Sequence, residues 1–319
     1  MQNLQLKTIF FGTPDFSIPA LEMLKNHPYI NLVLVVCNSD RPAGRGLKVK
    51  SQPTSQFAND NKIEVFQTDN LNAEQSLLDT LTKIKPDLFI VLAFSQFLSS
   101  KFLNLPRLGC FNIHTSVLPK YRGAAPIQYA LLNGDKETGV SIQHMVKKMD
   151  AGDVVHKAHV EISEMEDFPQ LYTRLKFYSA LCLNDFLDIL LKNRINPEAQ
   201  DSAQVTFAPS IKKTDGMINF LKEDASKVCN KIRAFKPWPG TYFFINGKMI
   251  KILKARAHSG CDIPAGDIRI ANGKFLIGCI SNSHLEILEL WPEGKKPQSS
   301  KDFINGVKNF QDLKITYEK

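Results

Sequence analysis

Residues 109–126 contain the densest group of side chains that could do chemistry. A predicted strand ends at about His114, and Asn112 lies two residues earlier, so both side chains face the same side of that strand. Histidine titrates near neutral pH and can move a proton. An asparagine amide offers N–H donors to an oxygen that becomes negative. Together they suit acyl transfer through a tetrahedral intermediate, although a lone Asn-x-His sequence is weak evidence because such a histidine is more often structural.

A second candidate is the segment 149–153, which lies between two strand-like runs. Its aspartate and glycine residues are typical of a turn. The segment could also supply a carboxylate that orients His114 or favours its charged form. The spacing leaves open whether Asp150 or Asp153 would do so.

A third candidate is the loop at residues 40–50, which carries four basic residues against one acidic residue. A glycine-rich basic loop can follow a phosphate backbone, but it could equally be a solvated surface loop. Neither this loop nor the turn at residues 12–15 contains a GxGxxG or GxxxxGK[ST] pattern. Their absence argues against an enzyme that uses a nicotinamide cofactor.

The elements that must position these side chains alternate between short apolar runs and helical stretches. Nearly continuous apolar strands that alternate with helices predict an α/β fold with a mostly parallel sheet, covered on both faces. Ligands of such sheets bind beyond the carboxyl ends of the strands, which is where His114 lies. We expect strands at residues 8–11, 31–37, 63–66, 87–94, 110–114, 140–144 and 154–162, and helices at 16–24, 72–83, 125–132 and 168–192.

The pattern changes after residue 193. Residues 194–206 are polar, show no periodicity and are interpreted as a linker. Beyond them, one helix at 225–235 precedes short strand-like runs, two of which are followed by Asn-Gly turns typical of β-hairpins. We therefore predict a first domain at 1–193 and a small β-barrel domain at 207–319. The barrel strands are expected at residues 241–245, 249–254, 267–270, 275–280 and 284–290.

The charge is distributed unevenly. Residues 207–319 carry 19 Lys and Arg against 11 Asp and Glu, so the whole net charge of +8 lies in this part of the chain. A chain that is neutral over residues 1–206 and basic over residues 207–319 indicates a polyanionic partner, most simply nucleic acid. A lysine-rich solvated surface with no ligand is the alternative.

Composition limits the remaining possibilities. The six cysteines form no CxxC pair, and four lie in apolar runs, which favours reduced, buried thiols in a cytosolic protein. There is no zinc pattern, no signal-peptide layout and no apolar run long enough to span a membrane. His156 and His159 would point to opposite faces of a strand, so we expect no metal site there. Residues 235–240 form a rigid aromatic turn that is interpreted as a packing feature, although Trp238 could be exposed and stack on a ligand.

The chain resembles the methionyl-tRNA formyltransferase family across essentially its whole length. The resemblance rests on the order and spacing of several stretches, at residues 10–16, 40–46, 107–119, 121–128, 134–140, 150–153, 233–239 and 294–296. It implies a Rossmann-like formyltransferase domain joined to a basic, OB-like barrel. The implied activity is transfer of a formyl group from 10-formyltetrahydrofolate to the α-amino group of methionine on initiator tRNA.

The resemblance also implies roles for individual residues. The catalytic residues of the family fall on Asn112, His114 and Asp150. Its loop toward the tRNA acceptor end falls on residues 40–50, where Arg41, Arg45 and Lys48 are implied tRNA-binding residues and Arg45 is the key one. The folate signature falls on Ser116, Val117, Leu118 and Pro119.

Two positions depart from the family pattern. Val117 replaces a usual leucine, an apolar change that we expect to be tolerated. Thr115 stands where glycine is common, and a threonine would be strained there if the position needed a positive φ. We expect an extended conformation instead.

The resemblance sets several further expectations. The formyl donor is already activated, so no metal is needed, and the chain is expected to be a cytoplasmic monomer. The first rival is a folate-dependent formyltransferase that acts on a small-molecule amine such as an amino sugar nucleotide, but it would not need the basic loop or the basic domain. The second rival is a non-catalytic nucleic-acid-binding protein, and the presence of Asn112, His114 and Asp150 argues against it.

Overall fold

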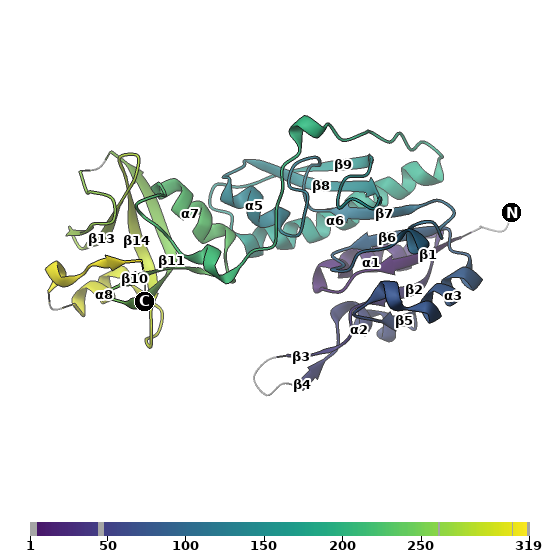
Figure 1. The fold of residues 1–319 in the computed structure, drawn as a ribbon, viewed down its shortest axis with the longest axis horizontal. Helices are drawn as coiled ribbons and strands as arrows, with labels where there is room; N and C mark the ends of the chain where they lie inside the picture. The colour runs from purple at the N-terminus through teal and green to yellow at the C-terminus, as the bar shows by residue number, and fades with distance from the viewer. Residues whose placement is uncertain (1–4, 44–47, 261, 308, 318–319) are drawn as a thin grey trace. The chain divides into compact units, whose positions relative to one another are not determined.

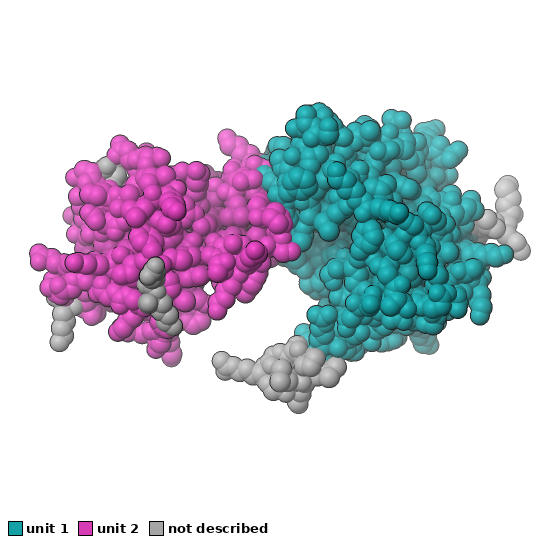
Figure 2. Space-filling model, in the orientation of Figure 1, with its two compact units in different colours: residues 1–126, 137–161, 172–208 teal, residues 127–136, 162–171, 209–319 magenta. Residues whose placement is uncertain are grey.

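The computed structural model describes the chain except residues 1–4, 44–47, 261, 308 and 318–319. It divides into two compact units, which Figure 2 shows in different colours. The first unit comprises residues 1–126, 137–161 and 172–208, and the second comprises residues 127–136, 162–171 and 209–319. Residues 194–206, which we interpreted from the sequence as a linker, are therefore grouped with the first unit.

The first unit is built on a seven-stranded sheet whose first five strands are parallel (Figure 1). Two antiparallel strands complete the sheet beyond β7. This confirms the predicted α/β fold with a mostly parallel sheet. In spatial order the strands are β5 (Glu64–Gln67), β2 (Ile30–Cys37), β1 (Leu6–Phe11), β6 (Leu88–Leu92), β7 (Cys110–His114), β8 (Glu137–His144) and β9 (Val154–Glu161).

Helices cover both faces of this sheet. Successive residues of a strand point to opposite sides, so strands that are apolar throughout present apolar side chains on both faces. Ile9 and Phe11 of β1 belong to a buried cluster with leucines of α3 (Gln75–Ile84) and with Phe102 of α4 (Ser100–Leu103). On β7, the ring of Phe111 packs against that of Phe186 of α6 (Phe168–Leu191), with 4.8 Å between the ring centroids and a tilted arrangement. The first unit also contains α1 (Ile18–Asn26) and α2 (Pro53–Asp60), whereas α5 (Pro126–Leu132) is grouped almost entirely with the second unit.

The second unit contains an antiparallel sheet that forms a half-barrel around α7 (Ala225–Ala234). Val228 and Ile232 of α7 share a buried core with residues such as Phe243 and Phe275 of the sheet. The side chain of Asp224 accepts a hydrogen bond from the Lys227 N–H and so caps the start of α7. The main path runs β12 (Ile268–Ala271), β13 (Lys274–Cys279), β14 (Ser283–Pro292), β11 (Lys248–Ser259), β10 (Thr241–Ile245) and β16 (Ile315–Thr316), and β15 (Gln298–Ser299) pairs with β14.

The predicted Asn-Gly hairpins are confirmed. Asn246 and Gly247 join β10 to β11, and Asn272 and Gly273 join β12 to β13. All four residues have a positive φ, between 48° and 74°. That conformation is what a two-residue hairpin turn requires and what the Asn-Gly sequence favours.

Several short elements were not predicted from the sequence. The loop at 40–50 contains a short antiparallel pair, β3 (Arg41–Ala43) and β4 (Lys48–Lys50). Helices α2, α4 and α8 (Ser300–Asn305) and the two-residue strands β15 and β16 were not expected either. The polar sequence of α2 gives little apolar periodicity, so its helical character depends on packing, with Thr54, Ser55 and Ala58 buried in the first unit.

No helix within the described part of the chain is long and apolar enough to cross a membrane.

Candidate active site

The candidate site lies at the carboxyl end of β7, between parallel β6 and antiparallel β8. Polar residues interrupt the apolar pattern of this strand. Asn112 is half-buried and His114 is buried. Both side chains reach the carboxylate of Asp150, which confirms that they face one side of the strand.

The Asp150 carboxylate is held by three hydrogen bonds. Oδ1 accepts from Nε2 of Gln143 at 2.9 Å and from Nδ2 of Asn112 at 3.3 Å. Oδ2 accepts from the backbone N–H of Gly123 at 2.9 Å. Asp153, the alternative that the sequence left open, is exposed. The structure therefore brings Asp150, and not Asp153, to His114.

The two ring nitrogens of His114 have different partners. Nε2 lies 2.8 Å from the backbone oxygen of Tyr121. A carbonyl oxygen can only accept, so Nε2 is the donor in this contact. Nδ1 lies 3.7 Å from Oδ2 of Asp150, which is within ion-pair distance but too long for a hydrogen bond. Nδ1 is therefore the nitrogen through which His114 can exchange a proton.

Three residues of this arrangement were missed in the sequence. Gln143 is the cross-strand neighbour of Asn112 on β8, and Tyr121 and Gly123 act through backbone atoms. The only sequence signal for Gln143 is a polar residue inside an apolar run. The order of the strands, which places it beside Asn112, is not readable from the chain.

The predicted folate stretch follows directly after β7. Ser116 and Leu118 are buried, while Val117 and Pro119 are half-buried. The hydroxyl of Ser141, on β8, donates to the backbone oxygen of Ser116 at 2.7 Å and accepts from the backbone N–H of Leu118 at 3.0 Å. These two bonds fix the turn between Ser116 and Leu118. Thr115 is not among the described residues with a positive φ, so its backbone is not in the left-handed conformation that would strain a threonine.

The predicted tRNA-binding loop is described only in part. Arg41 forms an exposed ion pair with Asp69, with 3.1 Å between Nη2 and Oδ1. Lys48 pairs through its backbone with Ala43. Arg45 lies outside the described residues, and the three tRNA-binding assignments stay predictions.

Other candidates from the sequence have separate surroundings. His156 lies 4.0 Å from Asp185 of α6, whereas His159 contacts Glu137 at 2.8 Å. Among the residues that the structure describes, no three His, Cys, Asp or Glu side chains are grouped to hold a metal ion. Trp238 is 56% exposed, which is the alternative that the sequence left open, whereas Phe235 of the same turn is buried.

The predicted burial of four cysteines is confirmed for Cys37, Cys110, Cys182 and Cys279. Burial raises the pKa of the Cys182 thiol to about 12 and that of Cys229 to about 11. These thiols are protonated at neutral pH, so they are poor nucleophiles.

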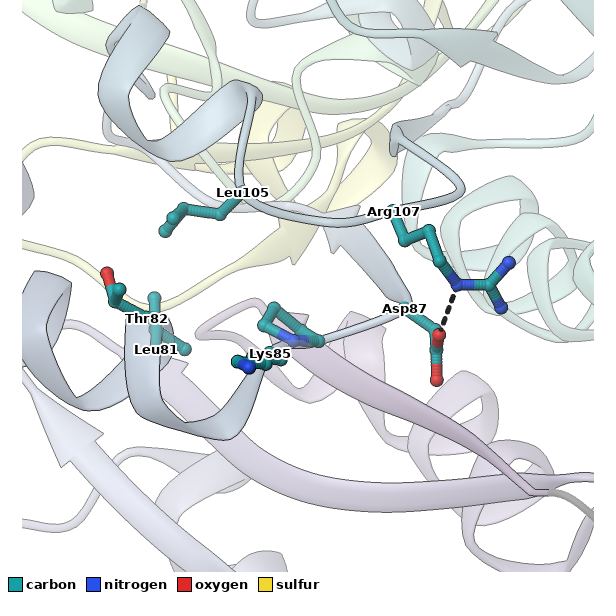
Figure 3. A pocket seen from close by; sticks show the side chains of 7 residues that line it. Leu81, Thr82, Lys85, Asp87, Leu105 and Arg107 are labelled. Carbon is teal, nitrogen blue, oxygen red and sulfur yellow. Dashed lines mark hydrogen bonds and ion pairs between the residues drawn. The ribbon is translucent and has the colours of Figure 1, made fainter.

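A hollow of about 290 Å³ lies at the opposite end of the strands (Figure 3). It is lined in part by Lys85, Leu105 and the ion pair between Arg107 and Asp87, the residue directly before β6. The hollow is thus at the amino end of β6, away from His114, and contributes nothing to the candidate site.

Comparisons with known proteins define the class. The family described as formyl transferase matches residues 6–185, and the family described as formyl transferase, C-terminal domain, matches residues 210–308. The fold, the polar group at the end of β7 and these two matches together define a formyltransferase.

Relatives that match nearly the whole chain identify the kind of formyltransferase. The methionyl-tRNA formyltransferase of Geobacter metallireducens is 38% identical over 303 residues, which cover 95% of this chain and 96% of the relative. That of Lactobacillus delbrueckii subsp. bulgaricus is 40% identical over 299 residues, which cover 93% and 94%. The chain belongs to the methionyl-tRNA formyltransferase family.

A solved structure supports the fold. The crystal structure of WlaRD, a sugar 3N-formyl transferase in the presence of dTDP and 5-N-formyl-THF, has a TM-score of 0.68. It is 22% identical and covers 91% of this chain and 99% of that one. At this identity the likeness concerns the fold alone.

Proposed function

We propose that the protein transfers a formyl group from 10-formyltetrahydrofolate to the α-amino group of methionine on initiator tRNA. The observation that carries this proposal is the similarity to methionyl-tRNA formyltransferases, which spans both the catalytic part and the C-terminal domain. The contacts among Asn112, His114 and Asp150 support it, because they give the chain the groups that acyl transfer needs.

Asn112 stabilises the charge that grows on the formyl oxygen. One N–H of its amide nitrogen is directed to Asp150, and the same nitrogen carries a second N–H that can be donated to substrate. A fixed donor of this kind is typically worth about 10²–10³ in rate. The bond to Asp150 keeps the amide in place before substrate arrives.

His114 moves the proton. As the amine forms its bond to the formyl carbon and the bond to N10 of the folate breaks, one proton must pass from the amine to N10. Nδ1 of His114 can carry it, because Nε2 is committed to the Tyr121 oxygen. The nearby carboxylate of Asp150 stabilises the imidazolium that forms in between.

The residues after β7 suit the folate. The formyl donor supplies an activated one-carbon group, and its flat pterin ring needs an apolar wall beside the reacting groups. Val117 and Pro119 are apolar, partly exposed and only a few residues beyond His114. Ser141 fixes the turn that presents them.

The charge distribution suits a tRNA substrate. The excess of positive charge lies in residues 207–319, and Arg41, Arg45 and Lys48 add basic groups to the loop at 40–50. Such charges bind the phosphate backbone and steer its approach. We place the reaction in the cytoplasm, with the protein acting as a monomer.

The test is formylation of charged initiator Met-tRNA with 10-formyltetrahydrofolate as donor, run in parallel with charged elongator Met-tRNA. We expect formyl-methionine on the initiator only. Folate binding without formylation of either tRNA would instead favour a small-molecule amine as acceptor, such as an amino sugar nucleotide.

A further inference from the structure

Gln200 belongs to the segment after α6 that the sequence marks as a linker, yet its side chain reaches the turn that carries Asp150. Its Nε2 donates to the backbone oxygens of Asp150 at 2.9 Å and of Gly152 at 2.7 Å. Its Oε1 accepts from Nε of Arg122 at 3.0 Å and from Nη2 of Arg122 at 2.9 Å. Both N–H groups and both lone pairs of the amide are thus used.

The turn that Gln200 contacts needs support. Asp150 has a φ of +49°, in the left-handed region that is unfavourable for a residue with a Cβ. Gly152 has no room for a Cβ, which would collide with the backbone oxygen of His144. Contacts from outside the turn must therefore hold residues 150–152 in this conformation.

Arg122 provides a fixed anchor for Gln200. Arg122 is buried, with 6% of the residue exposed. Its backbone N–H donates to the Thr206 oxygen at 2.9 Å, and its oxygen accepts from the Ala208 N–H at 2.8 Å. The segment after α6 is thus bound at two points to the chain beside the candidate site.

The neighbours of Arg122 connect this anchor to the candidate site. Tyr121 accepts the hydrogen bond from His114, and Gly123 donates to the Asp150 carboxylate. The consecutive residues Tyr121, Arg122 and Gly123 therefore contact His114, Gln200 and Asp150, respectively. A shift of Gln200 would move Asp150 relative to His114.

We propose that Gln200 is a positioning residue for formyl transfer. It holds the 150–152 turn so that the Asp150 carboxylate faces Asn112 and His114, and so makes the segment after α6 part of the catalytic unit. The inference rests on the proposed function, because the reaction supplies its kinetic readout.

The test is Gln200→Glu, which keeps the size of the side chain. The new carboxylate can still accept from Arg122, so we expect the protein to fold. It cannot donate to the Asp150 and Gly152 oxygens, so the turn loses its support. We expect kcat to fall roughly ten- to hundredfold, the scale for a small misplacement of catalytic groups, with KM for folate and for tRNA within about twofold of wild type.

Gln204→Glu is the matched control. Gln204 is exposed in the same segment and contacts Asp201. This variant adds the same charge at nearly the same place in the chain, so it reports any general effect on tRNA binding. We expect its kcat to match that of the wild type. Gln200→Met, which is neutral and of similar length, also lacks the donor to the Asp150 and Gly152 oxygens. It gives the same prediction as Gln200→Glu without the added charge, and it removes the acceptor of Arg122 as well.

A second readout does not depend on the reaction. In protein labelled with ¹⁵N-histidine, the imidazole resonances of His114, assigned with a His114 variant, should move in Gln200→Glu and stay in place in Gln204→Glu. Unchanged kcat and unchanged resonances in Gln200→Glu would overturn the inference, as would a loss confined to KM. A wild-type protein that formylates neither tRNA would overturn the proposed function instead, and the resonances alone would then decide whether Gln200 positions Asp150.

Discussion

Nδ1 of His114 lies 3.7 Å from Oδ2 of Asp150, and both side chains are largely buried, at 6% and 11% exposed. The separation is too long for a hydrogen bond but short enough for an ion pair. Opposite charges attract more strongly in a buried site than in water, so in the proposed reaction Asp150 is placed to stabilise a positive charge on the ring of His114. The carboxylate is held in position by Asn112, Gln143 and Gly123.

We predict that Asp150→Asn lowers kcat by at least about a hundredfold. The amide has nearly the same shape, but it removes the negative charge that stabilises the imidazolium and disturbs the donors around it; losses of this order follow removal of one electrostatic contact in a transition state. Steady-state kinetics at saturating folate and tRNA measure the effect. Asp153→Asn, an exposed change in the same segment, is the control and should be near wild type. Equal kcat values for the two variants would rule out the role assigned to Asp150.

We predict that His114→Ala loses most turnover while substrate binding stays largely intact. In the proposed mechanism the change removes the proton carrier, while Val117, Pro119 and the basic residues of 207–319, which are proposed to bind the substrates, remain. Turnover is measured by formylation of initiator Met-tRNA, and binding by equilibrium titration with folate and with tRNA. Unchanged turnover would remove His114 from the mechanism, and parallel loss of both kinds of binding would point to a structural role.

Part of the site could be predicted because neighbouring residues in the sequence determine the strand and the side to which its side chains point. The strand Cys110–His114 has the predicted bounds, and a spacing of two placed Asn112 and His114 on one side. The choice between Asp150 and Asp153 could not be made from the residues alone. It depends on the turn conformation, in which Asp150 takes a positive φ.

The parts that could not be predicted come from contacts between distant segments. Gln143 reaches Asp150 because β8 pairs with β7, and nothing local fixes that pairing. Gln200 lies in a polar stretch without periodicity, which reads as a linker because its contacts are with Arg122 and the 150–152 turn rather than within itself. Turns and hairpins, such as Asn246-Gly247, were predicted well because their conformation is set by two residues.

We predict that Arg45→Ala weakens catalysis on tRNA while folate binding is retained. If the loop at 40–50 binds tRNA as proposed, removing one positive charge from it reduces attraction to the acceptor end, and the predicted folate stretch at 116–119 is unchanged. The measurement is kcat/KM for initiator Met-tRNA over a series of salt concentrations, together with folate titration. The wild type should lose tRNA affinity steeply as salt rises, and the variant less steeply, since it makes fewer phosphate contacts. Loss of folate binding in this variant would contradict the assignment of the loop.

The C-terminal half-barrel offers a test of stability that is independent of catalysis. Glu286 is buried on β14, where its Oε2 lies 2.8 Å from Nε2 of His258 and its Oε1 lies 3.2 Å from Nζ of Lys274. Burial favours the neutral carboxyl, but the hydrogen bonds from His258 and Lys274 outweigh burial and lower the pKa of Glu286. The ionised form is therefore stabilised more in the folded than in the unfolded chain.

We predict that Glu286→Gln lowers the free energy of unfolding at pH 7 by on the order of 1.5 kcal/mol, the scale for a hydrogen bond to a charged group. A carboxyl with a lowered pKa contributes stability that is complete above its ordinary value and is lost as the pH falls through the lowered one. The difference from wild type should therefore shrink as the solution is acidified below about pH 4. Urea unfolding at several pH values measures it. Glu289→Gln, an exposed position on the same strand, should show neither the loss nor the pH dependence. A deficit in Glu286→Gln that stayed constant into acid would show that packing, and not the charge of Glu286, stabilises this part of the sheet.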